Sequence, residues 1–294
     1  MLTKKHVMPP LLVLVCLLYA ALINPVEGRV VGVAVLPVIF AAIFAIQLLG
    51  FSYAWWARTE RFYDLIGSLT FITAVLLALI LNPVPSVYSY VMAALVVLWA
   101  LRLGTFLFLR IADVGEDRRF RKIKQSFWHF LLVWTLQGVW VSLTSSAALV
   151  AILSPGAGPI AGVAGLGVLI WLGGLTLEVV ADKQKSDFRN DPKNAGQFIC
   201  CGVWTVCRHP NYLGEIMLWT GVFLAALPVM HGWQFATVLS PLFVVILLTR
   251  ISGIPTLAHR GVSQWGEDPA YQAYLRDTPV LIPRLFAQRR VSKN

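Results

Sequence analysis

The chain has 294 residues, of which 58% are hydrophobic and only 13% are charged. Its mean hydropathy of +0.73 is far above that of a soluble domain. The formal net charge of +10 would suit nucleic-acid binding in a polar chain. In a chain this apolar, basic residues more often set the orientation in a membrane and contact anionic lipids. We therefore expect an integral membrane protein without a nucleic-acid partner.

Eight apolar runs approach or exceed the length that crosses ~30 Å of hydrocarbon as a helix, about 20 residues each. The alternation over about ten residues that marks strands of a membrane barrel is absent. Prolines lie in the connections, where a residue that cannot continue a helix is tolerated. The sequence thus predicts an all-α, polytopic membrane helix bundle with seven to eight transmembrane helices. The predicted spans are Val7–Asn24, Val31–Ala57, Phe62–Leu81, Ser86–Arg110, Phe127–Leu153, Ile160–Ala181, Tyr212–Leu227 and Phe235–Ile251.

The first span is short and follows Lys4 and Lys5, so residues 1–30 resemble a secretory signal peptide as well as an extra N-terminal transmembrane helix. Cleavage there would leave seven spans with unchanged orientation. We predict that residues 31–294 form a single membrane domain.

If successive spans cross the membrane in opposite directions, all but two of the 24 lysines and arginines lie on the same side of the membrane. The exceptions are Arg29 and Arg102. Short loops rich in these residues stay in the cytoplasm. We therefore predict a multi-pass protein of the bacterial inner (cytoplasmic) membrane, with both termini in the cytoplasm. The opposite connections, around Pro83 and between Ser154 and Pro159, are short and uncharged. Function is expected on the cytoplasmic half, where loops and the C-terminal tail would cap a cofactor.

The segment Gly156–Gly167 is rich in glycine. It opens a membrane helix and follows no strand, so it lacks the context of a dinucleotide-binding fingerprint. Close helix packing through small residues is the better interpretation.

Ionisable residues inside or beside a membrane helix indicate function, because their burial is costly. Glu178, Asp182, Lys185 and Arg189 have spacings of four, three and four residues, which stack them on one helix face. The alternative is a solvated helix end with ion pairs along the helix.

A second polar motif, Arg208–Glu215, begins the seventh span, with Pro210 suited to a first helical turn. A helix start beside Arg208 and His209 favours anions such as phosphates, and the carboxylate of Glu215 needs a partner at this depth. A juxtamembrane cluster whose long side chains reach the headgroups is the alternative.

Three residues of other spans are the predicted catalytic groups: Tyr63 and Asp64, at the inner end of the third span, and Arg102 in the fourth. Arg102 lies midway through its span and must face the bundle interior. Tyr63 and Asp64 are candidates to relay a proton, although Tyr63 also suits the aromatic belt of a membrane protein. Arg119 belongs to a basic turn that suits phosphates or, equally, lipid headgroups.

Other chemistries find little support. Cys200, Cys201, Cys207 and His209 do not have the spacing of a zinc site, so no metal is predicted. The sequence lacks the Gly-x-Ser-x-Gly motif of hydrolases, the His-Glu-x-x-His motif of zinc proteases and the Walker motif that binds nucleoside triphosphates.

With these motifs, the chain resembles the steroid 5-alpha-reductase family, in its bacterial, DUF1295-like branch of unknown function. The resemblance covers roughly residues 99–283. It rests on Trp99–Gly104, Gly115–Asp117, Leu177–Lys185, Arg208–Glu215, Ser252–Pro255, Tyr271–Tyr274 and Leu281–Pro283.

This resemblance implies an NADPH-dependent oxidoreductase of lipid metabolism that delivers hydride to a carbon–carbon double bond conjugated to a ketone. The substrate would be lipophilic, steroid- or isoprenoid-like. Leu101 stands where the steroid enzymes are expected to have a tyrosine, so the substrate stays open. Together, motifs and resemblance give the predicted cofactor-binding residues Arg119, Glu178, Asp182, Lys185, Arg189, Arg208, His209, Asn211, Tyr212, Glu215, His259 and Tyr274.

Two other classes compete with the reductase. The Arg-His-Pro-x-Tyr pattern also resembles membrane methyltransferases of the isoprenylcysteine carboxyl type, which bind S-adenosylmethionine. The surplus of arginines favours NADPH, because adenosylmethionine carries no phosphate. A transporter or scaffold would fit the spans but not the one-sided distribution of polar residues. Expected partners are the lipophilic substrate and membrane lipids, with no evident obligate protein partner.

Overall fold

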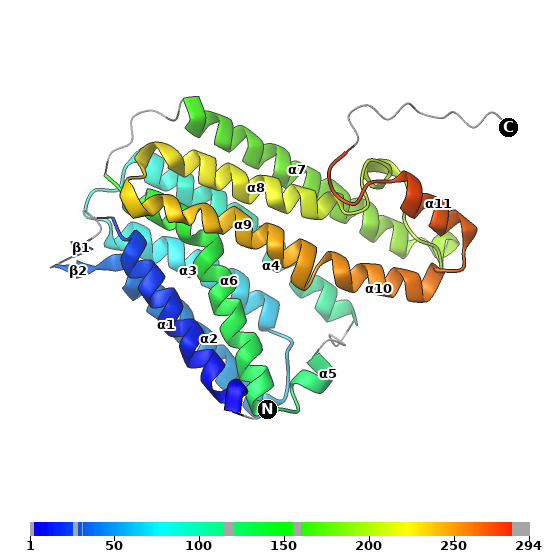
Figure 1. Cartoon of the computed structure of the whole chain (residues 1–294), viewed down its shortest axis with the longest axis horizontal. Helices are drawn as coiled ribbons and strands as arrows, with labels where there is room; N and C mark the ends of the chain where they lie inside the picture. Colours follow the sequence, from blue (N-terminus) through cyan, green and yellow to red (C-terminus); the bar gives the residue numbers. More distant parts are fainter. Residues whose placement is uncertain are drawn as a thin grey trace. The chain divides into compact units, whose positions relative to one another are not determined.

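The fold is known from a computed structural model that describes residues 3–25, 29–30, 32–114, 120–155, 160 and 162–283. Its elements are almost all helical (Figure 1). In chain order they are α1 (Thr3–Ile23), β1 (Arg29–Val30), β2 (Val33–Ala34), α2 (Val35–Ala57), α3 (Tyr63–Leu81), α4 (Val87–Val114), α5 (Phe120–Ile123), α6 (Phe127–Leu153), α7 (Gly162–Asn190), η1 (Pro192–Asn194), η2 (Gly202–Thr205), α8 (Pro210–Ala226), η3 (Leu227–Val229), η4 (Gly232–Val238), α9 (Leu239–Ile246), η5 (Leu247–Ile251), α10 (Ile254–Trp265) and α11 (Pro269–Asp277).

Eight helical segments of the described chain are long and apolar enough to cross a membrane. The prediction of an all-α, polytopic membrane bundle is therefore confirmed, and the protein is a multi-pass membrane protein. Strand structure in the described residues is limited to β1 and β2, which pair antiparallel. The eighth segment extends from Gly232 to Trp265, beyond the predicted Phe235–Ile251, because the π-helical turn η5 continues α9 toward α10.

The chain divides into two compact units, and the division falls within α7, α8 and α9. Unit 1 comprises Met1–Val168 and Gly221–Phe243, and unit 2 comprises Leu169–Thr220 and Val244–Asn294.

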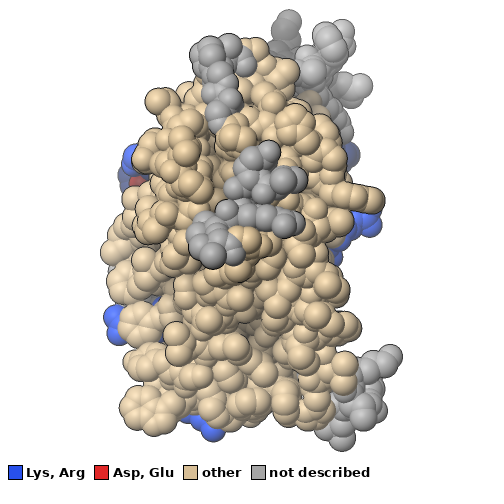
Figure 2. Space-filling view, turned by 90° about the vertical axis from the view of Figure 1, so that its left-hand side faces the viewer, with Lys and Arg blue, Asp and Glu red and all other residues tan. Residues whose placement is uncertain are grey.

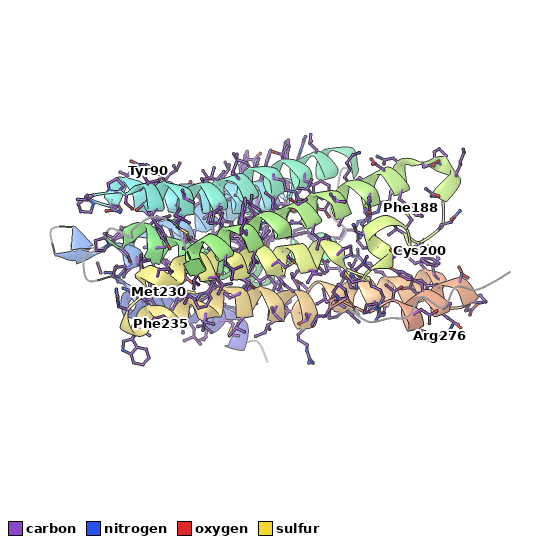
Figure 3. All side chains as sticks on the ribbon, turned by 90° about the horizontal axis from the view of Figure 1, so that it is seen from above. Tyr90, Phe188, Cys200, Met230, Phe235 and Arg276 are labelled. Atoms are coloured by element: carbon purple, nitrogen blue, oxygen red, sulfur yellow. The ribbon has the colours of Figure 1, made fainter. Side chains whose placement is uncertain are left out.

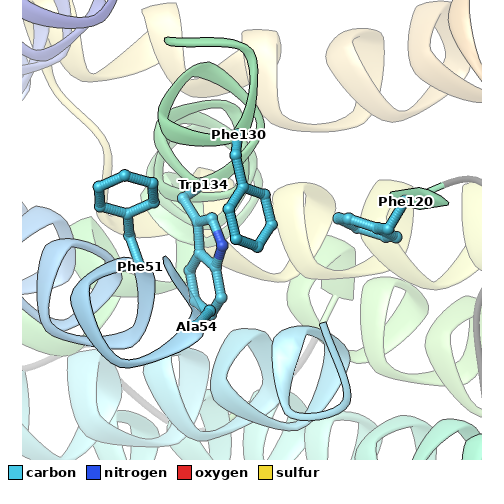
Figure 4. Close-up of a cluster of buried hydrophobic side chains, with 5 residues drawn as sticks. All are labelled: Phe51, Ala54, Phe120, Phe130 and Trp134. Carbon is cyan, nitrogen blue, oxygen red and sulfur yellow. The ribbon is translucent and has the colours of Figure 1, made fainter. Parts of the chain in front are cut away.

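Helix α6 is the centre of unit 1, where it packs against α1, α2, α3 and α4. In an 18-residue window of this helix 83% is buried, so α6 has little surface outside the bundle. Near its start, Phe130 and Trp134 meet Phe51 and Ala54 of α2, and Phe120 of α5 completes the cluster (Figure 4). This cluster fixes the start of α6 against the end of α2.

The two ends of unit 1 differ in charge. At one end the rings of His6 and Trp128 meet at a centroid distance of 4.2 Å, and Lys124 pairs with Glu60 at 2.8 Å. At the other end Asn82 donates to the Ile152 carbonyl. There, Arg29 is the one lysine or arginine among the described residues. On this side, the residues that Figure 2 does not draw in grey are mostly uncharged, with lysine and arginine at the margins. Within unit 1, charge is therefore concentrated at one end, as expected from the distribution of lysine and arginine in the sequence.

Glycine allows close helix packing where α7 begins. A Cβ at Gly167 would lie 2.6 Å from the Gly221 carbonyl oxygen of α8, closer than side chains approach. The interpretation of the glycine-rich segment as a packing surface is thus confirmed at Gly167.

Candidate functional site

The candidate site belongs to unit 2, where glycines bring the polar ends of α7 and α8 together. A Cβ at Gly214 would lie 2.6 Å from the Gly174 carbonyl oxygen and 2.8 Å from the Glu178 backbone nitrogen. Only glycine allows the two backbones to approach this closely. The antiparallel contact places Glu178 and Asp182 of α7 beside the first turns of α8.

Two of the acidic residues of α7 are buried at this contact, with 4% of Glu178 and 9% of Asp182 exposed. The Asn211 side-chain amide donates to Asp182 Oδ1 at 3.3 Å. A carboxylate only accepts hydrogen bonds, so this contact fixes the orientation of the amide. The carbonyl oxygen of Asn211 therefore points away from Asp182 and can accept from another group.

Lys185 lies about one turn further along α7, where the loop through η2 folds against the helix. Its ammonium group sits 4.9 Å from the centroid of the Trp204 ring. Trp204 donates to the Ala181 carbonyl at 3.2 Å, and the Val203 amide donates to Gln184 Oε1 at 2.9 Å. The loop through η2 is thus held along the last turns of α7.

A second set of contacts holds this loop from the opposite side. The Tyr274 hydroxyl of α11 donates to the Trp204 carbonyl at 2.8 Å, and the Arg208 amide donates to the Pro279 carbonyl at 2.8 Å. The Phe198 ring contacts the rings of Trp265, Tyr271 and Tyr274. Burial raises the pKa of Tyr274, so its hydroxyl stays a neutral donor. Figure 3 shows this end of unit 2, with Phe188, Cys200 and Arg276 labelled.

Arg208, His209 and Asn211 each bury a polar atom at the start of α8. Within the described residues, Arg208 Nε, His209 Nδ1 and Asn211 Oδ1 have no hydrogen-bond partner. Burying such atoms unpaired costs free energy. Burial first, and then the charges of Lys185 and Arg208, lower the pKa of His209 to about 4. The imidazole is therefore neutral at pH 7, and it stacks on the Tyr212 ring at 5.5 Å between centroids.

The remaining predicted residues of unit 2 lie at the margin of this group. Tyr212 is half-buried and packs against Gly253, and Glu215 is half-buried one turn into α8. Arg189 is exposed in the last turn of α7. His259 is exposed on α10, and no described contact connects it to the start of α8. The structure thus brings together Glu178, Asp182, Lys185, Arg208, His209 and Asn211, with Tyr274 behind the loop.

The predicted catalytic residues belong to unit 1. The Tyr63 hydroxyl donates to the Val133 carbonyl at 3.1 Å, and its ring packs on Phe120 and Trp134. Asp64 is half-buried in the first turn of α3. The guanidinium of Arg102 lies 5.5 Å from the Phe106 ring centroid, so it extends toward the charged end of its helix. Arg119 lies outside the described residues.

The cysteines of this region are free thiols: Cys200 and Cys201 are exposed, and Cys207 is buried. Across the described residues, no group of three or more histidine, cysteine or acidic side chains is arranged to hold a metal ion.

A protein-family model described as "Protein of unknown function (DUF1295)" matches residues 50–278. The chain belongs to this family. The match begins in α2 and extends through α11, so it includes every predicted site residue of the DUF1295 chain. No curated protein and no solved structure matches it.

Proposed function

We propose that this DUF1295 protein is a membrane-embedded, NADPH-dependent reductase. It would transfer hydride to a carbon–carbon double bond conjugated to a ketone in a lipophilic, steroid- or isoprenoid-like substrate. The observation that carries the proposal is the convergence, in unit 2, of cationic, acidic and amide side chains around buried polar atoms at the start of α8. The resemblance of the motifs to the steroid 5-alpha-reductase family supports it.

The basic residues of the site suit the phosphates of a dinucleotide. Lys185 and Arg208 both act on the pKa of His209, so their charges lie close to it. The first turn of α8 adds backbone amide groups and the positive end of a helix of 17 residues. Arg208 Nε, buried and without a described partner, would donate to a phosphate oxygen.

The acidic and amide groups suit the uncharged parts of the same cofactor. Asp182 accepts hydrogen bonds, and the Asn211 carbonyl oxygen needs a donor. Ribose hydroxyls and a carboxamide supply such donors. When bound, NADPH would supply the hydride.

Reduction of the double bond also needs a proton. We propose that Asp64, or Tyr63 next to it in the sequence, relays this proton, whereas the guanidinium of Arg102 keeps its proton and would act through its charge. Because the Tyr63 hydroxyl donates to the Val133 carbonyl, we propose that Tyr63 mainly stabilises packing and that Asp64 is the first candidate for the proton relay.

For localisation, we propose the bacterial inner membrane, with both termini in the cytoplasm. The support is the distribution of lysine and arginine between the loops.

The second candidate function is an S-adenosylmethionine-dependent methyltransferase of the isoprenylcysteine carboxyl type. The burial of two carboxylates, Glu178 and Asp182, favours it, because adenosylmethionine is a cation. The cations beside them favour NADPH.

Thermal unfolding of the purified full chain in detergent, with NADPH, NADH or S-adenosylmethionine, distinguishes these functions. We expect NADPH to raise the melting temperature most, because an extra 2′-phosphate meets Arg208 and Arg189. A ligand present at 100 times its Kd stabilises by about 2.7 kcal/mol. Stabilisation by S-adenosylmethionine alone would overturn the reductase in favour of the methyltransferase.

A further inference from the structure

The loop between α2 and α3 lies where lipid headgroups are expected. It joins two membrane spans, Val35–Ala57 and Tyr63–Leu81, through only five residues, 58–62. Lys124, just before the span of α6, is bound to this loop: its ammonium pairs with Glu60 at 2.8 Å, and its carbonyl accepts from Arg58 at 3.4 Å. Three spans therefore place their basic ends together.

The charge of this region is unbalanced. Arg58, Arg61 and Lys122 are exposed, and no salt bridge is found for them among the described residues. Glu60, the acidic residue within this loop, is only 7% exposed and is paired with Lys124. Three cations are thus available to an anion from outside the chain.

The backbone conformation of Arg58 indicates that an arginine side chain is needed at this position. Arg58 caps α2 with φ +52°, and it is the one non-glycine residue with positive φ in the described chain. Glycine or asparagine is preferred at such a cap. The guanidinium lies 3.7 Å from the centroid of the Trp55 ring, which orients it while leaving further N–H groups able to donate.

Exposed aromatic rings mark the level of the headgroups. Trp56, in the last turn of α2, is 80% exposed, and Tyr53 is 48% exposed. Exposed tryptophan and tyrosine at the end of a span are typical of the boundary between hydrocarbon and water. Arg58 and Arg61 therefore follow this belt directly in the sequence, and Lys122 lies two residues before Lys124, which is bound to the same loop.

We propose that Arg58, Arg61 and Lys122 bind the phosphate of an anionic phospholipid from the surrounding bilayer. Arginine forks suit phosphate oxygens, and negatively charged lipid surfaces attract basic segments beside spans. The site lies in unit 1 and does not depend on the cofactor proposed for unit 2.

The test compares the melting temperature of the full chain in nanodiscs of phosphatidylcholine alone with nanodiscs that also contain phosphatidylglycerol. We expect phosphatidylglycerol to raise the melting temperature of the unaltered protein, and added salt to reduce the increase. Arg58→Gly suits the positive φ, so it should fold normally in phosphatidylcholine and lose most of the increase. Arg61→Gln with Lys122→Gln leaves the α2 cap intact and should give the same loss.

The matched control is Arg276→Gln, an exposed arginine that pairs with the adjacent Asp277. It should keep the whole increase. An undiminished increase in both the Arg58 variant and the Arg61/Lys122 variant would overturn the proposal. An equal increase from inorganic phosphate in phosphatidylcholine nanodiscs would also overturn it, because the ligand would then be a soluble anion.

Discussion

Substituting Asp182 with asparagine separates a binding role from a structural one. The substitution keeps the shape of the side chain and an oxygen that can accept from Asn211, so the contact at 3.3 Å can persist. What is lost is the negative charge at a position that is 9% exposed. We expect little change in stability and a clear loss of NADPH affinity.

The size of the loss follows from the kind of hydrogen bond removed. A hydrogen bond to a charged group contributes about 1.5 to 3 kcal/mol. One such bond from a ribose hydroxyl or a carboxamide to Asp182 corresponds to roughly a ten- to hundredfold increase in Kd. Glu215→Gln, one turn into α8, should weaken NADPH binding in the same range.

The assay is NADPH fluorescence titration beside thermal unfolding of the same preparations. Asp187→Asn is the matched control, because Asp187 is exposed on the same helix and pairs with Lys183 across the surface. Such pairs contribute little, so both its Kd and its melting temperature should match those of the unaltered protein. An unchanged Kd for Asp182→Asn together with a large fall in melting temperature would refute the reasoning and make Asp182 a structural residue.

Three further predictions concern packing and protonation. Gly214→Ala forces its Cβ against the α7 backbone and should cost about 1 to 3 kcal/mol of stability. The control, Gly173→Ala, places a Cβ that meets only Met217 at 3.7 Å, so it should be neutral or stabilising. Equal effects of the two substitutions in thermal unfolding would contradict the close approach of α7 and α8. The pKa of His209 is lowered from 6.5 to about 4, so the unfolded chain binds its proton at a higher pH than the folded chain. The free energy of unfolding should therefore fall by about 3 kcal/mol between about pH 7 and pH 4, and chemical unfolding of His209→Gln should lack this component. Tyr63→Phe loses the bond to Val133 and should cost about 1 kcal/mol while turnover is retained; a turnover loss of a hundredfold or more would restore the proton-relay role.

The spans could be predicted because length and hydropathy alone decide whether a helix crosses a bilayer. Their ends were harder to place. At the first span the ends agree, because His6–Ile23 lies within one residue of the predicted Val7–Asn24. The last span was predicted to end at Ile251, but η5 carries the helical path onward, and a π-helical turn has no local sequence signal of the kind that proline provides.

The acidic part of the site could be predicted, whereas its framework could not. The spacing of Glu178 and Asp182 gives their common face, and the motif starting at Arg208 gives the start of α8. The contacts of Phe198 with Trp265 and Tyr271, and of Tyr274 with Trp204, join residues about 70 positions apart, and local periodicity contains no such information. The close approach of Gly174 to Gly214 is equally a property of the pair. His259, predicted for the cofactor, lies exposed on α10.

The contacts that hold the η2 loop have a consequence for biosynthesis. The residues that hold the loop around Trp204 are synthesised after the loop itself. Trp265 bonds to Gly196, Tyr274 to Trp204, and Pro279 to Arg208. A nascent chain synthesised only as far as η5 would therefore still have an unsecured loop that a protease can reach. Completion of α10 and α11 on the ribosome should then be the step that makes the nascent protein resistant to degradation.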